Sequence, residues 1–388
     1  MKIFVITSRI PWPLEKGDKL RIYHQLKHLS KNNEIMLCCL SDEKLPSDGM
    51  ENLMSICSEV EVIPLNKLLI IWRMFLAIFS DQPFQVHYFY QRHVRRRVYE
   101  LVKQFQPDHI YCQLIRTAEH VKHIHEVPKT LDYMDAFNKG IERRIGKSSW
   151  FMKRVLREEF RRLVAYENLI YEYFEHHTII SEQDRDFIFH PQRKAIAVIP
   201  NGVDQEYFYP ISKPKKYHLV FTGNMNYPPN IDSAVLLAEI ILPLVQKVMP
   251  EVKLLIAGAQ PSNRVKALQS DSVTVTGWMD DIRDAYAESQ VFVAPMQIGS
   301  GLQNKLLEAM SMKLPCITSL LANNALGAED GKDILIGKQP EDFAKLAIEL
   351  LRNEKLAQDI AAAGHVFVKK SYSWEHSSAE LEKLMHGK

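Results

Sequence analysis

A glycine-rich turn followed by a lysine and a glutamate stands at residues 299–310, Gly-Ser-Gly-Leu-Gln-Asn-Lys-Leu-Leu-Glu-Ala-Met. The turn follows an apolar run at residues 291–295, so the expected order is strand, loop and helix. A helix that begins after glycines leaves its first N–H groups unpaired, and with the helix dipole these groups bind anions. We therefore expect a phosphate group at this turn.

Lys305 and Glu308 stand three residues apart, so they share one face of the expected helix and are displaced by about 4.5 Å along its axis. That displacement is close to the step from the diphosphate to the ribose of one nucleotide. An ordinary solvated ion pair has the same spacing, and this alternative stays open.

Two earlier loops have the same form. The loop at residues 221–230 ends an apolar run, and Gly223 and Asn224 let its backbone approach an anion closely. A further loop offers the ring of Trp278 and the backbone of Met279 for recognition of a base. Each loop alone also fits an ordinary strand-to-helix turn, and Trp278 alone fits a core residue. Their occurrence in sequence favours one nucleotide site.

The composition points to an average globular protein with more than one domain. A chain of 388 residues exceeds what one hydrophobic core usually serves, so two domains are expected. A formal charge of +2 gives no indication of nucleic-acid binding. The five cysteines have no Cys-x-x-Cys spacing, which indicates neither a disulfide framework nor a zinc site and fits a cytoplasmic protein.

Short apolar runs alternate with amphipathic helical patterns along the chain. In the first half they fall at 2–8, 34–40, 60–65, 108–113, 129–135, 176–181 and 195–200. In the second half they fall at 216–223, 252–258, 273–277, 291–296, 315–319 and 333–337. Val, Ile and Leu runs separated by helices are typical of parallel sheets covered on both faces. The sequence therefore predicts an α/β protein with two doubly wound, Rossmann-like domains.

The boundary between the domains is expected near residues 201–216, where Gly, Pro and Lys interrupt the apolar pattern. This places residues 1–208, with a C-terminal helix at 372–388 crossing back, in the first domain and residues 209–371 in the second. Ligands of open parallel sheets bind at the carboxyl ends of the strands, so a cleft between the two domains is the expected active site.

In the first domain, the loop at residues 11–18 joins the first strand to a helix expected at 19–30. Gly17 would allow close approach of a ligand, and Asp18 would cap the helix. The basic residues near this loop would suit a phosphorylated acceptor, and an ordinary solvated loop is the alternative. They are Arg9, Lys16 and Arg21.

Asp132 and Asp135 stand at the end of another expected strand, 129–135. A carboxylate at that position could orient an acceptor hydroxyl. Capping of the following helix is the alternative use of an aspartate here.

Four segments together resemble the GT-B retaining glycosyltransferases, specifically glycosyltransferase family 4 and the bacterial sugar transferases of exopolysaccharide systems within it. They are residues 8–21, residues 199–204 (Ile-Pro-Asn-Gly-Val-Asp), residues 221–230, and residues 299–310 followed by 314–318. The resemblance implies two facing domains, the first for the acceptor and the second for a nucleotide-sugar donor. It also implies transfer of a sugar, with retention of configuration, to a glycan or lipid-linked acceptor in surface polysaccharide synthesis.

The chain departs from the family pattern at several positions. The family motif carries two glutamates. The second falls on Glu308 and would hold the ribose hydroxyls, whereas Ser300 stands in place of the first. Lys305 matches a lysine that faces the donor phosphates. A basic pair of many members is replaced by Asn-Met-Asn at 224–226. A histidine of many members is missing after the strand at 109–113.

The residues that follow this strand are not general bases, so we expect them only to position the substrates. The polar ones are Gln113 and Arg116. The donor-binding residues implied by the resemblance and by the three loops are Gly223, Asn224, Asn230, Trp278, Met279, Ser300, Gly301, Leu302, Gln303, Asn304, Lys305 and Glu308. The predicted acceptor-binding residues are Arg9, Lys16, Gly17, Asp18, Arg21 and Asp132. The predicted catalytic residues are Lys305, Asp135 and Arg116.

Sugar transfer requires stabilisation of the departing diphosphate, which Lys305 and the backbone N–H groups near Gly223 and Gly301 would provide without a metal. The leaving phosphate itself would accept the proton of the acceptor. No cofactor is expected beyond the nucleotide-sugar substrate. The Asp-Arg-Asp at residues 184–186 has the spelling of a metal-binding motif, but positions i and i+2 of a helix face different ways, so a solvated surface is expected there.

A membrane surface is a further candidate partner. Residues 68–79 are rich in Leu, Ile, Trp and Phe, and the basic segments 92–97 and 143–162 follow. Such a pattern is typical of docking on anionic lipid from the cytoplasmic side, and a buried core helix is the alternative. No run of about 18 apolar residues is found, which is the length that a membrane-spanning helix needs.

Two other functions remain open. A nucleotide-sugar epimerase has the same two-domain architecture and would release an epimerised nucleotide sugar without an acceptor. A catalytically silent sugar-nucleotide-binding subunit would fit the missing histidine and the missing first glutamate. A dinucleotide-dependent dehydrogenase is disfavoured, because no Gly-x-Gly-x-x-Gly follows the first strand.

Overall fold

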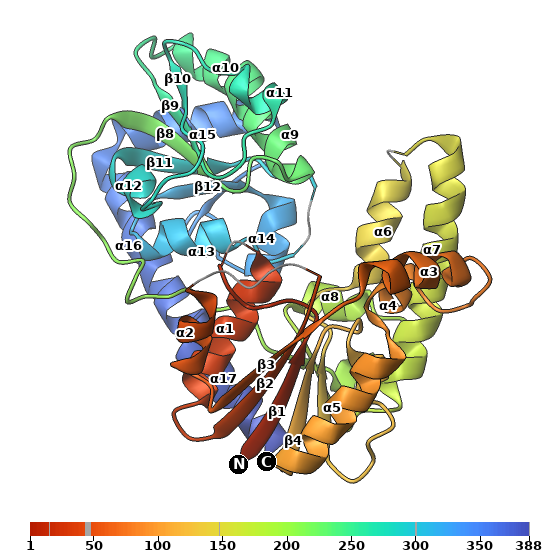
Figure 1. Ribbon diagram of the computed structural model, residues 1–388. Coiled ribbons are helices and arrows are strands. Elements are labelled where there is room, and N and C mark those ends of the chain that lie inside the picture. Colours follow the sequence, from red (N-terminus) through yellow and green to blue (C-terminus); the bar gives the residue numbers. More distant parts are fainter. Residues whose placement is uncertain (15, 43–47, 147, 299–300, 388) are drawn as a thin grey trace. The chain divides into compact units, whose positions relative to one another are not determined.

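The computed structural model describes residues 1–14, 16–42, 48–146, 148–298 and 301–387 (Figure 1). The chain forms two compact units. Unit 1 consists of Met1–Pro200 and Trp374–Lys388, and unit 2 of Asn201–Ser373. Each unit contains one sheet in which every pair of neighbouring strands is parallel.

The sheet of unit 1 has seven strands in the order β3-β2-β1-β4-β5-β6-β7. Their bounds are β1 Lys2–Thr7, β2 Glu34–Ser41, β3 Glu59–Pro64, β4 His109–Gln113, β5 Lys129–Asp132, β6 His176–Ile179 and β7 Ala197–Val198. Alternate residues of β1 enter two different cores: Phe4 and Ile6 pack in one, and Ile3 and Val5 in the other. Both faces of the sheet are therefore covered, which explains the continuous apolar runs.

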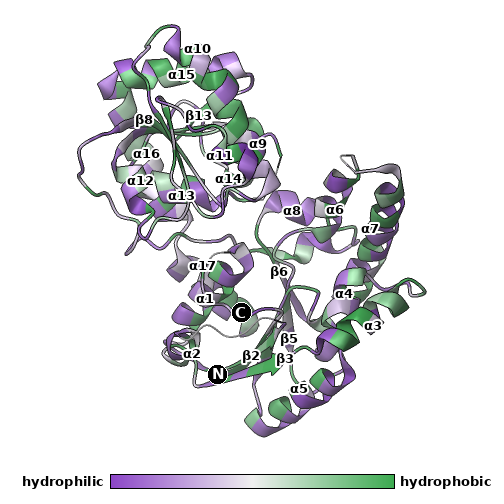
Figure 2. Ribbon diagram, turned by 45° about the horizontal axis from the view of Figure 1, so that its top comes forward, coloured by the Kyte–Doolittle hydropathy of each residue, from purple (hydrophilic) through white to green (hydrophobic). Residues whose placement is uncertain are grey.

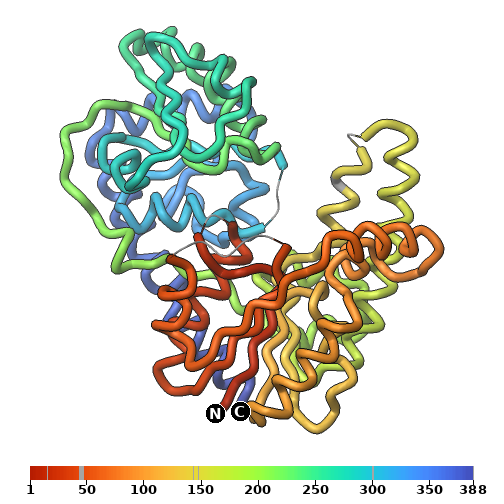
Figure 3. The backbone as a smooth tube through the Cα atoms, in the orientation of Figure 1, coloured from red at the N-terminus to blue at the C-terminus, as the bar shows by residue number. Residues whose placement is uncertain are grey.

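Helices cover both faces of this sheet. They are α1 Gly17–Leu29, α2 Gly49–Met54, α3 Lys67–Ala77, α4 Phe84–Phe89, α5 Arg92–Phe105, η1 Ala118–His120, α6 Phe137–Gly146, α7 Trp150–Tyr171, α8 Glu182–Asp186 and η2 Arg193–Ala195. The last helix, α17 (Trp374–Met385), returns to pack on α1 and shares its core with the N-terminus, so both chain ends lie in unit 1 (Figure 3).

The sheet of unit 2 has six strands in the order β10-β9-β8-β11-β12-β13. Their bounds are β8 Tyr217–Thr222, β9 Leu254–Ala257, β10 Val273–Val275, β11 Ser289–Ala294, β12 Cys316–Ser319 and β13 Leu335–Gly337. The helices are α9 Pro228–Leu236, η3 Leu237–Ile241, α10 Leu242–Gln246, α11 Asn263–Lys266, α12 Arg283–Ala287, α13 Asn304–Ser311, α14 Leu320–Leu326, α15 Pro340–Arg352 and α16 Glu354–Ser371. The apolar strands appear as green arrows inside the helices (Figure 2).

Every apolar run that predicted a strand contains one, and the prediction of two parallel α/β sheets is confirmed. The strand ends differ. The run 129–135 predicts a longer strand than β5, which ends at Asp132 because Met134 has a positive φ of 64°. A left-handed residue leaves the extended conformation and ends strand pairing.

The change from one unit to the other lies at Pro200 rather than at residue 208. The Val203 N–H donates to the Tyr372 carbonyl at 2.9 Å, and Val203 forms a β-bridge with Ser373. These bonds attach the segment after Pro200 to unit 2.

One helical stretch of the described chain, Pro228–Gln246, is long and apolar enough to cross a membrane, with a mean hydropathy of 1.4. Asp232 and Glu239 interrupt this stretch, so it is not a continuous apolar run. Half of the stretch is buried, and Ala234, Leu237 and Ile241 pack in the core of unit 2. These features are those of a core helix.

Candidate functional site

The loops of interest in unit 2 follow β8, β10 and β11. In this sheet β8 and β11 are neighbours, although their crossover helices lead to opposite halves of the sheet. Such a reversal of strand order is where ligands bind in open parallel sheets. The segment after β8 therefore meets the segment after β11, where Lys305 donates a hydrogen bond to Asn230.

Lys305 lies in the first turn of α13 and is 9% exposed. Its ammonium group donates a hydrogen bond to Oδ1 of Asn230 and lies 4.7 Å from the centre of the Phe221 ring. Burial lowers the pKa of Lys305 to about 7, whereas the Glu308 carboxylate acts in the opposite direction. Lys305 is thus a buried basic side chain beside the loop after β8.

Gly223 is required by the geometry of this contact. Its φ is +149°, and a Cβ atom there would lie 2.7 Å from Nδ2 of Asn230 and 3.1 Å from Nζ of Lys305. A neighbouring glycine, Gly258, is even more constrained, because a Cβ would lie 1.9 Å from the Gly223 carbonyl oxygen. Glycine at 223 lets the backbone approach the lysine, and glycine at 258 lets the end of β9 approach Gly223.

Asn230 links the two loops. Its Nδ2 donates to the Asn224 carbonyl at 2.9 Å, while its Oδ1 accepts from Lys305. The amide orientation is consistent with both bonds, so the Lys305 ammonium group is fixed relative to the backbone that surrounds Gly223.

Glu308 is partly buried and accepts a 2.6 Å hydrogen bond from the Tyr286 hydroxyl. Tyr286 also meets Thr222 Oγ1 at 2.8 Å. Burial raises the pKa of the Glu308 carboxyl, while the Tyr286 bond and Lys305 lower it. Because Lys305 is buried and each side chain is bonded elsewhere, the alternative of a solvated surface ion pair is wrong.

The start of α13 keeps its N–H groups available. Gln303 occupies the N-cap position, but its side chain bonds the Gly301 carbonyl at 2.8 Å, and within the described part of the loop no side chain caps the helix. Asn304 accepts from Asn201 at 3.4 Å, and Leu302 packs against the core. Ser300, predicted to bind the donor, lies outside the described residues.

The loop after β10 exposes an aromatic ring. Gly277 has a φ of +76° and its carbonyl accepts from Gly258, while Trp278 is 65% exposed. The alternative of Trp278 as a core residue is therefore wrong, whereas its role in base recognition stays a prediction. Met279 is partly buried against the core.

Sequence reasoning missed several residues of this site. Phe221, Thr222, Gly258 and Tyr286 all contact the lysine, the glutamate or the loop around Gly223. Gly258 follows a strand directly, which is a usable signal. Nothing in the sequence around Tyr286 indicates a role in the site, because only the packing of α12 on β8 brings it to Glu308.

In unit 1 the predicted acceptor residues divide into two groups. Near the surface, Arg9 pairs with Asp18 at 2.6 Å, and Lys16 is exposed. The prediction that Asp18 caps α1 is wrong, because the helix begins at Gly17 with Lys16 at the N-cap. A Cβ on Gly17 would meet only Met134 at an ordinary 3.6 Å.

Arg21 and Asp132 form the second group, which is fully buried. Arg21 donates to Asp132 from Nε at 2.7 Å and from a terminal nitrogen at 3.2 Å, and it also donates to the Ile199 carbonyl. Tyr111 and Thr178 donate to the same carboxylate. Neither side chain presents an atom to solvent, so the expected direct contact with an acceptor is corrected to an internal ion pair.

The two remaining predicted residues of unit 1, Arg116 and Asp135, follow the carboxyl ends of β4 and β5. Arg116 donates to Gln85 at 2.7 and 3.0 Å, and its guanidinium lies 4.7 Å from the centre of the Phe137 ring. Asp135 is exposed. Asp184 is buried and accepts from Ser181, which corrects the expectation of a solvated surface for that residue. The described residues contain no group of three or more His, Cys, Asp or Glu side chains suited to a metal.

Comparison with known proteins agrees with this geometry. Residues 216–353 match the family described as "Glycosyl transferases group 1". A protein of Klebsiella pneumoniae, described as "Uncharacterized 44.6 kDa protein in cps region", is 22% identical over 401 residues and covers 96% of both chains.

Among solved structures, sucrose-phosphate synthase from Thermosynechococcus elongatus superposes with a TM-score of 0.70 at 14% identity, covering 100% of this chain and 98% of that one. HepE from Anabaena, in complex with UDP and glucose, gives 0.68 at 14% identity, covering 100% of both chains. TarM gives 0.69 at 12% identity, covering 99% of this chain and 98% of that one. The fold is therefore GT-B, and the match within unit 2 supports a GT-B glycosyltransferase.

Proposed function

We propose that this protein is a retaining, metal-independent glycosyltransferase of family 4. It moves a sugar from a nucleotide-diphosphate sugar to a hydroxyl of a glycan or lipid-linked acceptor. The observation that carries the proposal is the buried Lys305 ammonium group, anchored by Asn230 beside Gly223 at the strand-order reversal of unit 2. This group lies within the segment that matches group 1 glycosyl transferases.

Lys305 would stabilise the departing diphosphate. A phosphate beside the ammonium group favours its charged form, so the pKa of about 7 in the free protein would rise when the nucleotide binds. The uncapped first turn of α13 would add backbone N–H donors to the same phosphates. Both contributions strengthen as charge develops on the leaving group, which is what accelerates transfer.

Glu308 would hold the ribose. Tyr286 donates to its Oε2, so Oε1 is the carboxylate oxygen that, among the described contacts, is left to accept from ribose hydroxyls. Trp278 would stack on the base. In this proposal unit 2 binds the donor, and the strand ends of unit 1 that carry Arg116 and Asp135 bind the acceptor.

The acceptor class is proposed from the relatives. The Klebsiella relative is described by its place in a cps region, which supports a role in surface polysaccharide synthesis. HepE was solved with UDP and glucose, so a UDP-sugar is the first donor to test.

The decisive experiment is a thermal-shift screen with UDP-, GDP- and ADP-sugars, followed by an assay of nucleotide release with and without acceptor. We expect a shift with one base, and a loss of roughly 10²–10³-fold in turnover in Lys305→Ala. Lys332→Ala, a charge removal at an exposed ion pair of the same unit, is the matched control.

The other outcomes identify the alternatives. Nucleotide binding without any turnover would indicate a silent binding subunit. Release of an epimerised nucleotide sugar without acceptor would indicate an epimerase. Full activity in Lys305→Ala would contradict the proposed site.

A further inference from the structure

Arg116 has one edge of its planar guanidinium group occupied and another edge available. Its Nε donates to Oε1 of Gln85 at 3.0 Å, and its Nη2 donates to the same oxygen at 2.7 Å. These two nitrogens form the side edge of the group. The end edge, which Nη1 shares with Nη2, makes no hydrogen bond or ion pair to the described residues. Two parallel N–H groups therefore remain for a ligand.

Neighbouring side chains fix the orientation of this guanidinium group. Its central carbon lies 4.7 Å from the centre of the Phe137 ring and 5.6 Å from that of the Phe89 ring. Gln85, on α4, is itself held in place. Its N–H donates to Oε1 of Glu159 at 3.4 Å, and the Phe84 N–H donates to Oε2 at 2.8 Å. A group that is oriented before its ligand arrives loses little side-chain entropy on binding.

A carboxylate follows the neighbouring strand. Gln113 at the end of β4 pairs with Asp132 at the end of β5. Arg116 and Asp135 each stand three residues beyond that pair, so both follow the same edge of the sheet. Asp135 is exposed, and it forms no ion pair with the described residues. This edge thus offers a hydrogen-bond acceptor as well as a cation.

The charges around Arg116 leave it under-compensated. Burial lowers the pKa of its guanidinium group, and nearby Arg9 lowers it further. Asp18 and Asp135 act in the opposite direction. Because Arg9 and Asp18 pair with each other at 2.6 Å, their charges largely cancel. A bound monoanion would be stabilised by Arg116, whereas a dianion would also be repelled by the two aspartates.

We propose that the acceptor is a glycan whose terminal residue is a uronic acid. Its planar carboxylate would accept two parallel hydrogen bonds from the end edge of Arg116, and a ring hydroxyl would donate to Asp135. A neutral sugar offers Arg116 only hydroxyl oxygens, which are weaker acceptors than a carboxylate. The inference rests on the proposed function, of which it names the acceptor class, and it uses residues of unit 1 alone.

Saturation-transfer NMR titrations of the full chain, with and without UDP, test this inference. The ligands are methyl glucuronide and methyl galacturonide, the matching methyl glucoside and methyl galactoside, and glucose 6-phosphate. We expect at least one uronide to bind at least about tenfold more tightly than its neutral counterpart, as hydrogen bonds to a charged group imply. Glucose 6-phosphate should bind more weakly than that uronide.

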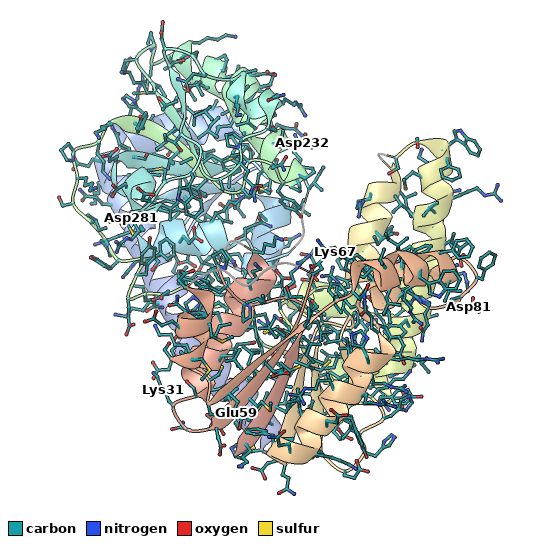
Figure 4. The ribbon with its side chains drawn as sticks, viewed as in Figure 1. Lys31, Glu59, Lys67, Asp81, Asp232 and Asp281 are labelled. Carbon is teal, nitrogen blue, oxygen red and sulfur yellow. The ribbon has the colours of Figure 1, made fainter. Side chains whose placement is uncertain are left out.

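Variants of Arg116 should remove the preference for a uronide. Arg116→Gln should abolish it, and Arg116→Lys should restore little of it, because an ammonium group has no planar edge. Arg161→Gln is the matched control. Arg161 belongs to the same unit and pairs with Glu158 and with Asp81, which Figure 4 labels at the outer edge of unit 1. Loss of that charge should leave the preference unchanged.

A second pair of variants keeps Arg116 in place. Gln85→Glu would retain the bonds to the side edge but neutralise the guanidinium group, so the uronide preference should fall at least about fivefold. Asp135→Asn should improve the binding of glucose 6-phosphate relative to the uronide, because it removes one of the repelling charges.

The inference is overturned if no uronide binds, or if uronides and neutral glycosides bind alike. It is also overturned if Arg116→Gln and Arg161→Gln behave alike, or if glucose 6-phosphate, the phosphorylated type of acceptor that Arg9 would suit, binds more tightly than the uronides. Nucleotide thermal shifts on the same variants separate this result from the proposed function. An intact shift without a uronide preference refutes the acceptor class alone, whereas the absence of any nucleotide shift in the wild type refutes the proposed function.

Discussion

The strand ends of the two units differ in how a buried positive charge is compensated. In unit 2 a lysine is buried against an asparagine and an aromatic ring, and its pKa falls to about 7. In unit 1 the buried Arg21 pairs with the Asp132 carboxylate, which accepts hydrogen bonds from three side chains and one backbone N–H group. The Lys305 ammonium group is bonded to a neutral amide and not to a carboxylate, so an anionic ligand would stabilise it. The Arg21 guanidinium is already paired with a carboxylate.

This difference indicates that Lys305 serves ligand binding and that the Arg21–Asp132 pair serves the stability of unit 1. An under-compensated buried cation lowers stability and becomes useful only when an anion arrives. A compensated ion pair instead ties together elements that are distant in sequence. The predictions below test that contrast, in order of decreasing effect.

Removal of one partner from the buried ion pair should have the largest effect. Asp132→Ala leaves the Arg21 guanidinium buried without its partner, so we expect the free energy of unfolding of unit 1 to fall by about 3–5 kcal/mol. Denaturant unfolding followed by two probes, one in each unit, measures it. Nucleotide affinity of the folded protein should persist, and its loss would show that the pair belongs to the binding site.

Removal of the Lys305 ammonium group should raise the free energy of unfolding instead of lowering it. The folded-state pKa of Lys305 is depressed to about 7, so its penalty is fully present below that pH and disappears as the pH rises toward the unfolded value. Lys305→Met should therefore stabilise unit 2 by about 1–4 kcal/mol at pH 6 while it weakens nucleotide binding. A destabilised variant would contradict the contrast.

Nucleotide binding should depend on pH through the same lysine. Because a bound phosphate raises the pKa of Lys305 above about 7, affinity is greatest below that pH and falls by up to about tenfold per unit above it, until the pKa of the bound form is passed. Calorimetry in buffers of different ionisation enthalpy should show proton uptake near pH 7. Lys305→Met is the control, because its affinity should not change with pH through this group. A pH-independent affinity in the wild type would contradict the prediction.

The exposed pair of unit 1 should contribute least. Arg9 is 34% exposed in its bond to Asp18, so Arg9→Gln should change the free energy of unfolding by less than about 1 kcal/mol. The same denaturation assay measures the change. If Arg9 binds a phosphorylated acceptor, this variant should raise the KM for the acceptor without a change in thermal stability.

Much of the fold could be read from the sequence, because apolar runs of strand length separated by helical patterns leave few alternatives to parallel sheets. The donor loops could be placed for the same reason, since each follows a strand. Helix starts were less predictable. Asp18 has the character of a cap, yet α1 begins one residue earlier, at Gly17.

By itself the sequence determined the type and order of the elements, and it put Lys305 and Glu308 on one helix face, because these properties depend on local periodicity. Tertiary structure alone decided that Lys305 is buried against Asn230, that Arg21 and Asp132 neutralise each other, and that α3 turns its apolar side outward. Each of these depends on which distant surfaces pack together, and burial sets the strength of charge and the availability of a side chain in ways that neighbours in sequence do not reveal.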